Sequence, residues 1–181
     1  MLPVEKLRAL YWAEIHMREA KEACIHMLSL DATARHEVRH CIYTGIVVSY
    51  ARSFGENQGL SALGKEFRRF DDPKMQKLHD ALLETRDTIY AHKDVRREGD
   101  RLSPEIRKDE LQTIRIDIAE SGESHWMVNR SFLPEDYLND IAALCDFQMA
   151  RMNQASRAML FHFCRSKQYL PGRYVLGENF P

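Results

Sequence analysis

The stretch DDPKMQKLHDALLETRDTIYAHK, residues 71–93, combines a helix start with an apolar repeat of helical period. Asp71 and Asp72 place negative charge at the positive end of a helix dipole, and Pro73 suits the first turn because its fixed φ is already helical. Apolar residues then recur on one side, at Met75, Leu78, Leu82 and Ile89. The stretch predicts a long amphipathic helix over about residues 73–93.

Helices are also predicted before and after this segment. Residues 3–29 begin with Pro3 and carry apolar residues at helical spacing. A second helix, capped by Asp31 or Thr33, is expected to run to about Phe54. A short helical turn is expected within residues 60–70. Pro134 opens a last long helix, about residues 134–166, whose apolar side is Leu138, Ile141, Leu144, Cys145, Met149 and Met152.

The second predicted helix has an apolar stripe made of residues of mixed size. Its members are Val38, Cys41, Ile42, Gly45, Val48 and Ser49. The small residues Gly45 and Ser49 suggest that a neighbouring helix lies in close contact with this stripe.

A β-hairpin is predicted over residues 113–128. Residues 113–118 alternate between apolar and polar, as a half-buried strand does. Ser121 and Gly122 can turn the chain, and residues 125–128 can return as the partner strand. The fold class predicted for the whole chain is mainly α, a four-to-five-helix up-and-down bundle with a small β-hairpin insertion near 113–128. No linker or internal repeat stands out, so residues 1–181 are expected to form a single helical domain.

The amino-acid composition excludes several classes of protein. A hydrophobic fraction of 44% and a charged fraction of 29% are those of a globular protein. A net charge of −1 argues against a surface coated in positive charge for bulk nucleic-acid binding. The four cysteines contain no CxxC pair, and neither a signal peptide nor a membrane-spanning run fits the sequence. We expect a cytoplasmic protein with free thiols.

The candidate site lies at the end of the 71–93 stretch. If Ile89 is the centre of the apolar stripe, Arg86 and His92 lie about 60° to either side of it. Both polar groups then flank the apolar seam of the helix. If that seam packs against a twofold-related copy, two arginines and two histidines converge in one groove. Asp87 is placed to orient Arg86 or the histidine of the other copy.

Such a groove has the chemistry for RNA cleavage. A histidine can take the proton from a ribose 2′-OH or protonate the leaving 5′-oxygen. An arginine can hold the phosphate with two donors and stabilise the charge that gathers on its oxygens. No metal ion or cofactor is required. The structural alternative is that His92 and Lys93 only favour the negative end of a helix.

Residues 82–94, which include Arg86-Asp87-x4-His92 and the ending Ala91-His92-Lys93-Asp94, resemble the signature of the HEPN superfamily. The Ala-His-x-Asp ending resembles its abortive-infection-like branch, and residues 49–54 resemble a helix end of such proteins. The resemblance implies a helical domain that acts as a metal-independent endoribonuclease. It also implies a homodimer, an RNA substrate and a role in toxin–antitoxin or phage-defence systems, with a cognate antitoxin protein as a partner. Arg86 and His92 would be the catalytic pair and Asp87 the polar auxiliary.

Two other functions fit parts of the sequence. Some HEPN members have lost activity and only bind, so the alternative is a non-catalytic helical module that binds RNA or protein. His36-Glu37-Val38-Arg39-His40 matches the HExxH pattern of zinc proteases, in which Glu37 would be the general base. Arg39 beside the proposed cation and the lack of an evident third ligand favour a solvated helix face instead. The basic residues within 93–108 are interleaved with acidic ones, which favours a solvated loop.

Overall fold

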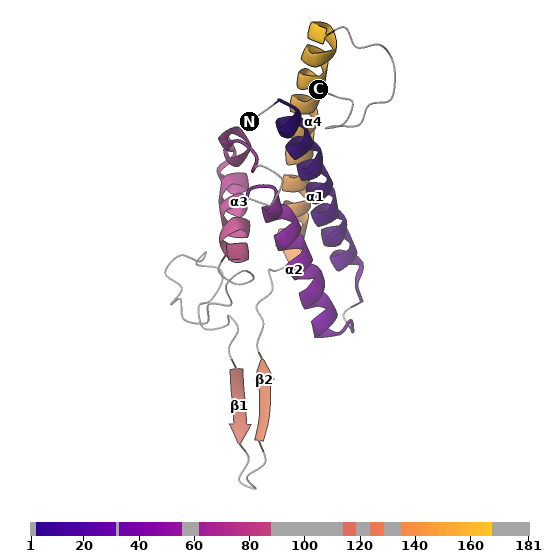
Figure 1. The fold of residues 1–181 in the computed structure, drawn as a ribbon. Helices are drawn as coiled ribbons and strands as arrows, with labels where there is room; N and C mark the ends of the chain where they lie inside the picture. Colours follow the sequence, from indigo (N-terminus) through magenta and orange to yellow (C-terminus); the bar gives the residue numbers. More distant parts are fainter. Residues whose placement is uncertain are drawn as a thin grey trace.

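The computed structural model describes residues 3–31, 33–55, 62–87, 114–118, 124–128 and 135–167. Within these ranges the chain forms four α-helices, one 3-10 helix and two strands (Figure 1). The elements are α1 (Pro3–Ser29), α2 (His36–Arg52), η1 (Lys65–Arg68), α3 (Pro73–Thr85), β1 (Ile114–Ile118), β2 (Ser124–Val128) and α4 (Glu135–Lys167). The prediction of a mainly helical fold is confirmed. The single-domain organisation stays a prediction.

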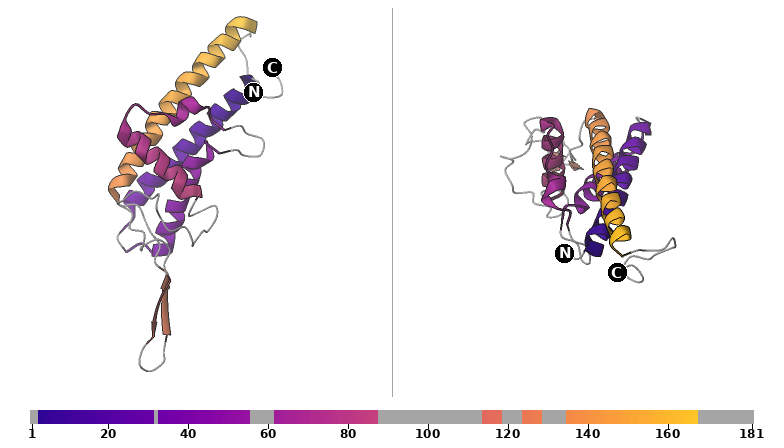
Figure 2. Two further views of the ribbon diagram at one scale, coloured as in Figure 1. Left: turned by 90° about the vertical axis from the view of Figure 1, so that its left-hand side faces the viewer. Right: turned by 90° about the horizontal axis from the view of Figure 1, so that it is seen from above.

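The long helices α1 and α4 lie side by side and antiparallel (Figures 1 and 2). Near one end of the pair, Lys21 Nζ lies 2.8 Å from Asp146 Oδ1. Near the other end, buried Leu7 packs in one cluster with Phe163. Between these points both helices contribute fully buried apolar residues to the main core, among them Leu10, Met17, Ile141, Leu144 and Met152. The apolar side predicted for the last helix is therefore its core side.

Helix α2 packs antiparallel against α1, but with the face opposite to the one that the sequence suggested. Tyr43, Ile46, Val47 and Tyr50 are buried. Of the predicted stripe, Val38, Cys41 and Gly45 are exposed, and the other three residues, Ile42, Val48 and Ser49, are half-buried at its edges. Both faces of α2 are apolar, so the period of apolar residues does not decide between them. The larger side chains face inward, because they remove more apolar surface from water.

The start of α2 also differs from the prediction. The helix begins at His36, and its N-cap residue, Arg35, makes no side-chain capping hydrogen bond. Asp31 instead accepts a hydrogen bond from the backbone N–H of Thr33, at 2.8 Å. This bond lowers the pKa of the Asp31 carboxyl. An Asp side chain can satisfy the backbone of a turn as readily as that of a helix start, and here it shapes the α1–α2 connection.

Helix α3 begins where the sequence indicates. Asp72 is the N-cap and accepts a hydrogen bond from the backbone N–H of Lys74, at 2.8 Å, and Pro73 occupies the first turn. Leu78 and Leu82 are buried in the main core, with Met75 packed against it. The α-helix ends at Thr85 and a π-type turn follows at residues 86–87. Residues 88–93 of the predicted helix, Ile89 among them, lie outside the described residues.

The predicted helical turn within residues 60–70 is the 3-10 helix η1. Side chains of α4 hold η1 in place by donating hydrogen bonds to its backbone carbonyls. Gln148, fully buried, donates to the carbonyl of Phe67 at 2.7 Å. Arg151 donates to the carbonyl of Glu66 and lies over the rings of Phe67, Phe70 and Phe147, 5.4 to 5.5 Å from their centroids. Gln76 of α3 donates to the carbonyl of Arg68 at 3.2 Å.

Strands β1 and β2 pair antiparallel, with Ile114 opposite Val128, Ile116 opposite Trp126 and Ile118 opposite Ser124. Figures 1 and 2 show the two strands beyond one end of the helices. The strands fall within the predicted 113–128 range. The turn expected between them, and the side chains of both strands, lie outside the described residues. No helix in the described part of the chain is long and apolar enough to cross a membrane.

Candidate functional site

Arg86 lies at the carboxyl end of α3, with its side chain 37% exposed. Its backbone N–H donates to the carbonyls of Leu82 and Leu83 and so closes the helix. Its guanidinium donates from Nη1 to Oδ1 of Asp87 at 2.6 Å. The predicted auxiliary residue therefore contacts one side of the arginine fork, and both side chains are partly exposed to solvent.

Two further arginines meet the carboxyl end of α2 near Arg86. A Cβ atom placed on Gly55 would lie 3.8 Å from Nη2 of Arg86. Arg68 donates to the carbonyl of Phe54 and lies 6.0 Å from the centroid of its ring. Arg52 is in the last turn of α2. The negative end of a helix dipole stabilises cations, which accounts for the arrangement structurally. The same three charges also make this end of α2 attractive to an anion such as a phosphate.

The pKa values of two buried histidines are lowered in part by nearby arginine charges. Burial is the main cause that lowers the pKa of His16, and the charge of Arg52 adds to it. Burial likewise lowers the pKa of His79 to about 4, with further lowering by Arg68 and Arg151.

His92 lies outside the described residues, so its proposed pairing with Arg86 stays a prediction. The apolar seam that His92 and Arg86 were expected to flank is built into the chain's own core through Leu78 and Leu82. Leu78 and Leu82 therefore face the chain's own core, and the homodimer interface predicted along this helix stays a prediction. The basic residues expected in a loop at 93–108 also lie outside the described residues.

The HExxH match gains no third ligand from the residues that the structure describes. His36 and Glu37 are exposed at the start of α2, and Arg35 Nε lies 3.8 Å from Glu37 Oε2. Nowhere in the part of the chain that the structure describes do three His, Cys, Asp or Glu side chains gather where they could hold a metal ion.

A buried histidine at the centre of the fold was not singled out from the sequence. His79 is 1% exposed, and its Nδ1 shares a hydrogen bond of 2.8 Å with the hydroxyl of Tyr50. The rings of Phe54 and Phe70 lie with their centroids 4.7 and 5.1 Å from that of His79. Its Nε2 is buried and has no hydrogen-bond partner among the described residues. The spacing Met75, Leu78, His79, Leu82 (i, i+3, i+4, i+7) is a core pattern that could have revealed it.

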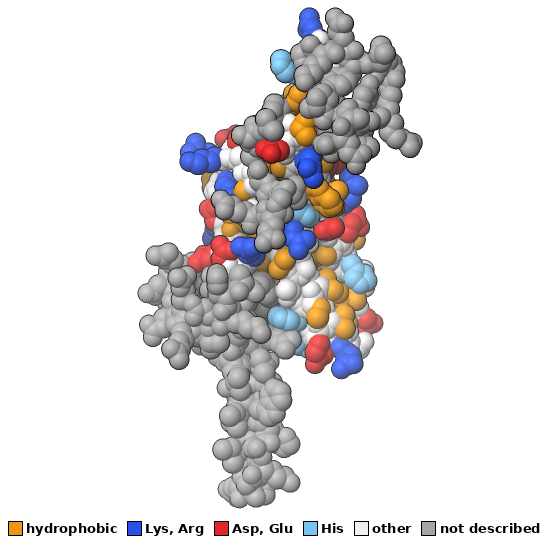
Figure 3. Space-filling view, in the orientation of Figure 1, with side chains coloured by type: hydrophobic (Ala, Val, Ile, Leu, Met, Phe, Trp, Pro, Cys, Tyr) orange, Lys and Arg blue, Asp and Glu red, His pale blue; other side chains and the backbone are white. Residues whose placement is uncertain are grey.

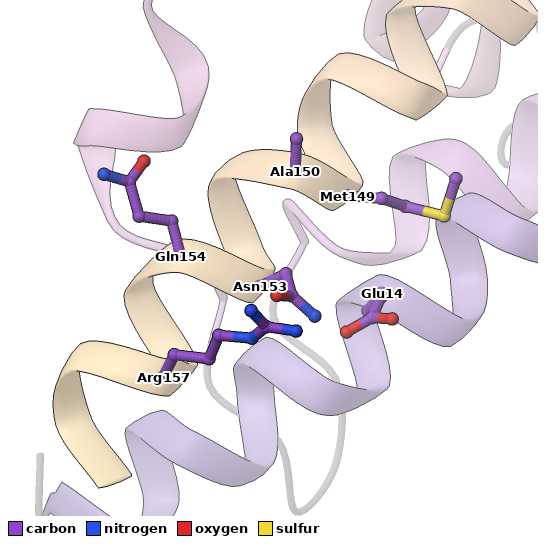
Figure 4. A pocket seen from close by; sticks show the side chains of 6 residues that line it. All are labelled: Glu14, Met149, Ala150, Asn153, Gln154 and Arg157. Atoms are coloured by element: carbon purple, nitrogen blue, oxygen red, sulfur yellow. The ribbon is translucent and has the colours of Figure 1, made fainter. Parts of the chain in front are cut away.

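A groove of about 510 Å³ runs along α1 and α4 (Figure 4). Glu14 lies on its α1 side, and the groove is otherwise lined by Met149, Ala150, Asn153, Gln154 and Arg157 of α4. Figure 4 shows the Arg157 side chain directed toward Glu14 and Asn153. Glu14 already has a partner, Arg18, at 3.0 Å. The face of the molecule in Figure 3 shows side chains of both charges interspersed, as the net charge of −1 leads one to expect.

A comparison with models of known protein families found no match, and comparisons with curated proteins and with solved structures found none either.

Proposed function

We propose that this chain is a metal-independent endoribonuclease of HEPN type, with Arg86 as the phosphate clamp and His92 as the proton-transfer group. The observation that carries the proposal is the position of Arg86. Its guanidinium is accessible at the end of α3, is oriented by Asp87 at 2.6 Å, and stands six residues before His92 in the pattern that resembles the HEPN signature.

Arg86 has support from its surroundings. Arg52 and Arg68 add positive charge at the same end of α2, so a phosphate beside Arg86 would be attracted by more than one cation. Asp87 neutralises part of the charge of Arg86 through its contact with Nη1. Nη2 lies on the side of Gly55, 3.8 Å from where a Cβ atom on that glycine would be.

The proposed reaction uses the substrate's own 2′-OH as nucleophile. A base removes the 2′-OH proton, the 2′-oxygen attacks the phosphorus, and the bond to the 5′-oxygen breaks as that oxygen gains a proton. His92 serves as the base or the acid, and Arg86 stabilises charge on the phosphate oxygens. The products end in a 2′,3′-cyclic phosphate and a 5′-hydroxyl. A homodimer with RNA as substrate, a toxin or phage-defence role, an antitoxin partner and a cytoplasmic location belong to the same proposal.

The test is incubation of the purified chain with total RNA in the presence of EDTA. Cleavage is expected to persist, and a DNA strand of the same sequence should stay intact because it lacks the 2′-OH. His92→Ala is expected to lower the rate by about 10²–10⁴-fold, whereas His162→Ala, which changes an exposed histidine on α4, should not. Arg86→Lys keeps the charge but loses the planar fork, so it should be impaired, unlike Arg69→Lys at another exposed position.

Two outcomes contradict the mechanism: cleavage that disappears with EDTA, and cleavage of DNA at the same rate. Retention of RNA by a chain that cannot cleave it would indicate the alternative, a non-catalytic binding module.

A further inference from the structure

The outer face of α2 has the composition of a helix contact, yet part of it is exposed in the described structure. Relative to Gly45, at about 100° per residue, Val38, Cys41, Ile42, Val48 and Ser49 all lie within about 60° of the same direction. None of the six carries a charge. Val38 is 44% exposed, Cys41 and Gly45 are exposed, and a Cβ atom on Gly45 would meet nothing within 4 Å. We call these six residues the α2 outer face.

A helix that is apolar on all sides is ordinarily buried on all sides. The inner face of α2, with Tyr43, Ile46, Val47 and Tyr50, is buried against the chain's own core. On the outer face, Val38, Cys41 and Gly45 are exposed. Its other three residues, Ile42, Val48 and Ser49, are half-buried, and Ile42 packs against the edge of the main core. Figure 3 shows uncharged surface, white and orange, over α2 and the adjacent part of α1. A glycine at its centre would let the backbone of another helix approach closely, as small residues do at helix contacts in other settings.

The charges at the two ends of the face favour a second copy of the same chain. Glu37 lies eight residues before Gly45, and Arg52 lies seven residues after it. If two α2 helices cross antiparallel at Gly45, positions about equally far before and after the glycine, and on the same side of the crossing, come close. Glu37 of each copy then approaches Arg52 of the other, so the opposite charges complement each other twice. Along the centre, Cys41 approaches Val48 of the other copy, and Ile42 approaches Ser49.

We propose that the α2 outer face is a self-association surface, through which two copies of this chain form a twofold-symmetric dimer with antiparallel α2 helices centred on Gly45. The two contacts of such a dimer are identical, as an isologous interface requires. The proposal does not rest on the ribonuclease activity, and its tests measure association without RNA.

Sedimentation of the full chain at micromolar concentration tests it first. The wild type is expected to be a dimer, and Gly45→Arg should raise the dissociation constant by about tenfold or more, because a long charged side chain would stand at the crossing. Open space above Gly45 allows the variant to fold, which circular dichroism checks. Ala158→Arg places the same side chain on an exposed position of α4 and should leave the dissociation constant unchanged.

The antiparallel arrangement has its own test. Glu37→Arg and Arg52→Glu should each weaken the dimer, because each places like charges opposite one another. The double variant exchanges the two charges and should restore association. Thiol labelling gives a third measurement with a control in the same molecule. Labelling of Cys41, on the α2 outer face, should slow as protein concentration rises, whereas labelling of exposed Cys164 should not.

A chain that stays monomeric, and so leaves the face to a different partner, overturns the proposal. So does a dimer that Gly45→Arg does not weaken. A double charge variant that associates no better than the two single variants would overturn the antiparallel crossing.

Discussion

Acidification is expected to destabilise this protein through His79. The pKa of His79 is lowered from 6.5 to about 4 in the folded chain, mainly because the imidazole is buried. Between these values the unfolded chain binds a proton at this residue and the folded chain does not. The stabilisation is therefore present in full above pH 6.5 and is lost progressively as the pH falls through 6.5 toward 4.

The size of the effect follows from the two pKa values. Their difference corresponds to a maximal loss of about 3 kcal/mol in the free energy of unfolding. About 2 kcal/mol of this loss should occur between pH 7 and pH 5. That is a large fraction of the stability of an ordinary domain, about 5–15 kcal/mol.

Urea unfolding at pH 7 and pH 5 measures this loss. The comparison is the double variant Tyr50→Phe/His79→Phe, which removes both partners of the buried hydrogen bond, so that neither hydroxyl nor imidazole is left unpaired. Its loss between the two pH values should be about 2 kcal/mol smaller than that of the wild type. The variant keeps some slope of the same sign, because the pKa of His16 is also lowered by burial. His162→Gln, at an exposed position, is the control. Equal losses in wild type and double variant would refute the reasoning.

Three further outcomes are expected. Cys24 and Cys145 should resist a thiol reagent at pH 8 until the chain is unfolded. The reason is that burial raises the pKa of Cys24 to about 12 and raises that of Cys145 further. Mass spectrometry that locates label on either cysteine in the folded chain would contradict this. Arg151→Leu should lower the free energy of unfolding by about 2 kcal/mol, through loss of its stacking on Phe67 and its hydrogen bond to the η1 segment. Arg165→Leu, at an exposed residue of the same helix, should change this free energy by less than about 0.5 kcal/mol. Equal effects of the two variants in urea unfolding would contradict the stabilising role of the Arg151 contacts. Gly55→Ala should leave the rate of RNA cleavage unchanged, because its methyl would be in ordinary contact with Arg86. Gly55→Leu should reduce the rate by displacing the Arg86 guanidinium. A larger loss of cleavage in Gly55→Ala than in Gly55→Leu would exclude this placement of Arg86.

Structure is predicted most reliably from sequence where interactions within one helical turn determine it. Asp72 and Pro73 are a helix start in the sequence and in the structure, because the capping carboxylate and the fixed proline φ act within one turn. The bounds predicted for the first and last helices, 3–29 and about 134–166, lie within one residue of those of α1 and α4. Asp31 shows the limit of this approach, because a side chain that can cap a helix can equally close a turn, and only the path of the chain decides between them.

The sequence predicts less well where the outcome depends on a partner element. The two faces of α2 are both apolar, and which one meets α1 depends on how Tyr43, Ile46 and Tyr50 fit there. His79 is polar by type, and its burial depends on Tyr50, Phe54 and Phe70, which come from other parts of the chain. Arg86 and Asp87 were identified by residue type, by spacing and by the HEPN resemblance. Their side chains are in contact at 2.6 Å, and the catalytic and auxiliary roles stay a prediction. The convergence of Arg52 and Arg68 on the same helix end has no signature in the spacing.

The hydrogen bonds that hold η1 in place determine which of its positions can change their amino acid. The donors are side chains, those of Gln76, Gln148 and Arg151, but the acceptors are backbone carbonyls of residues 66–68. A carbonyl is present whatever side chain its residue carries. Position 66, which is exposed, could therefore change its amino acid without loss of the bond made to it. A saturation library over the chain should tolerate most substitutions at position 66 and few at positions 148 and 151.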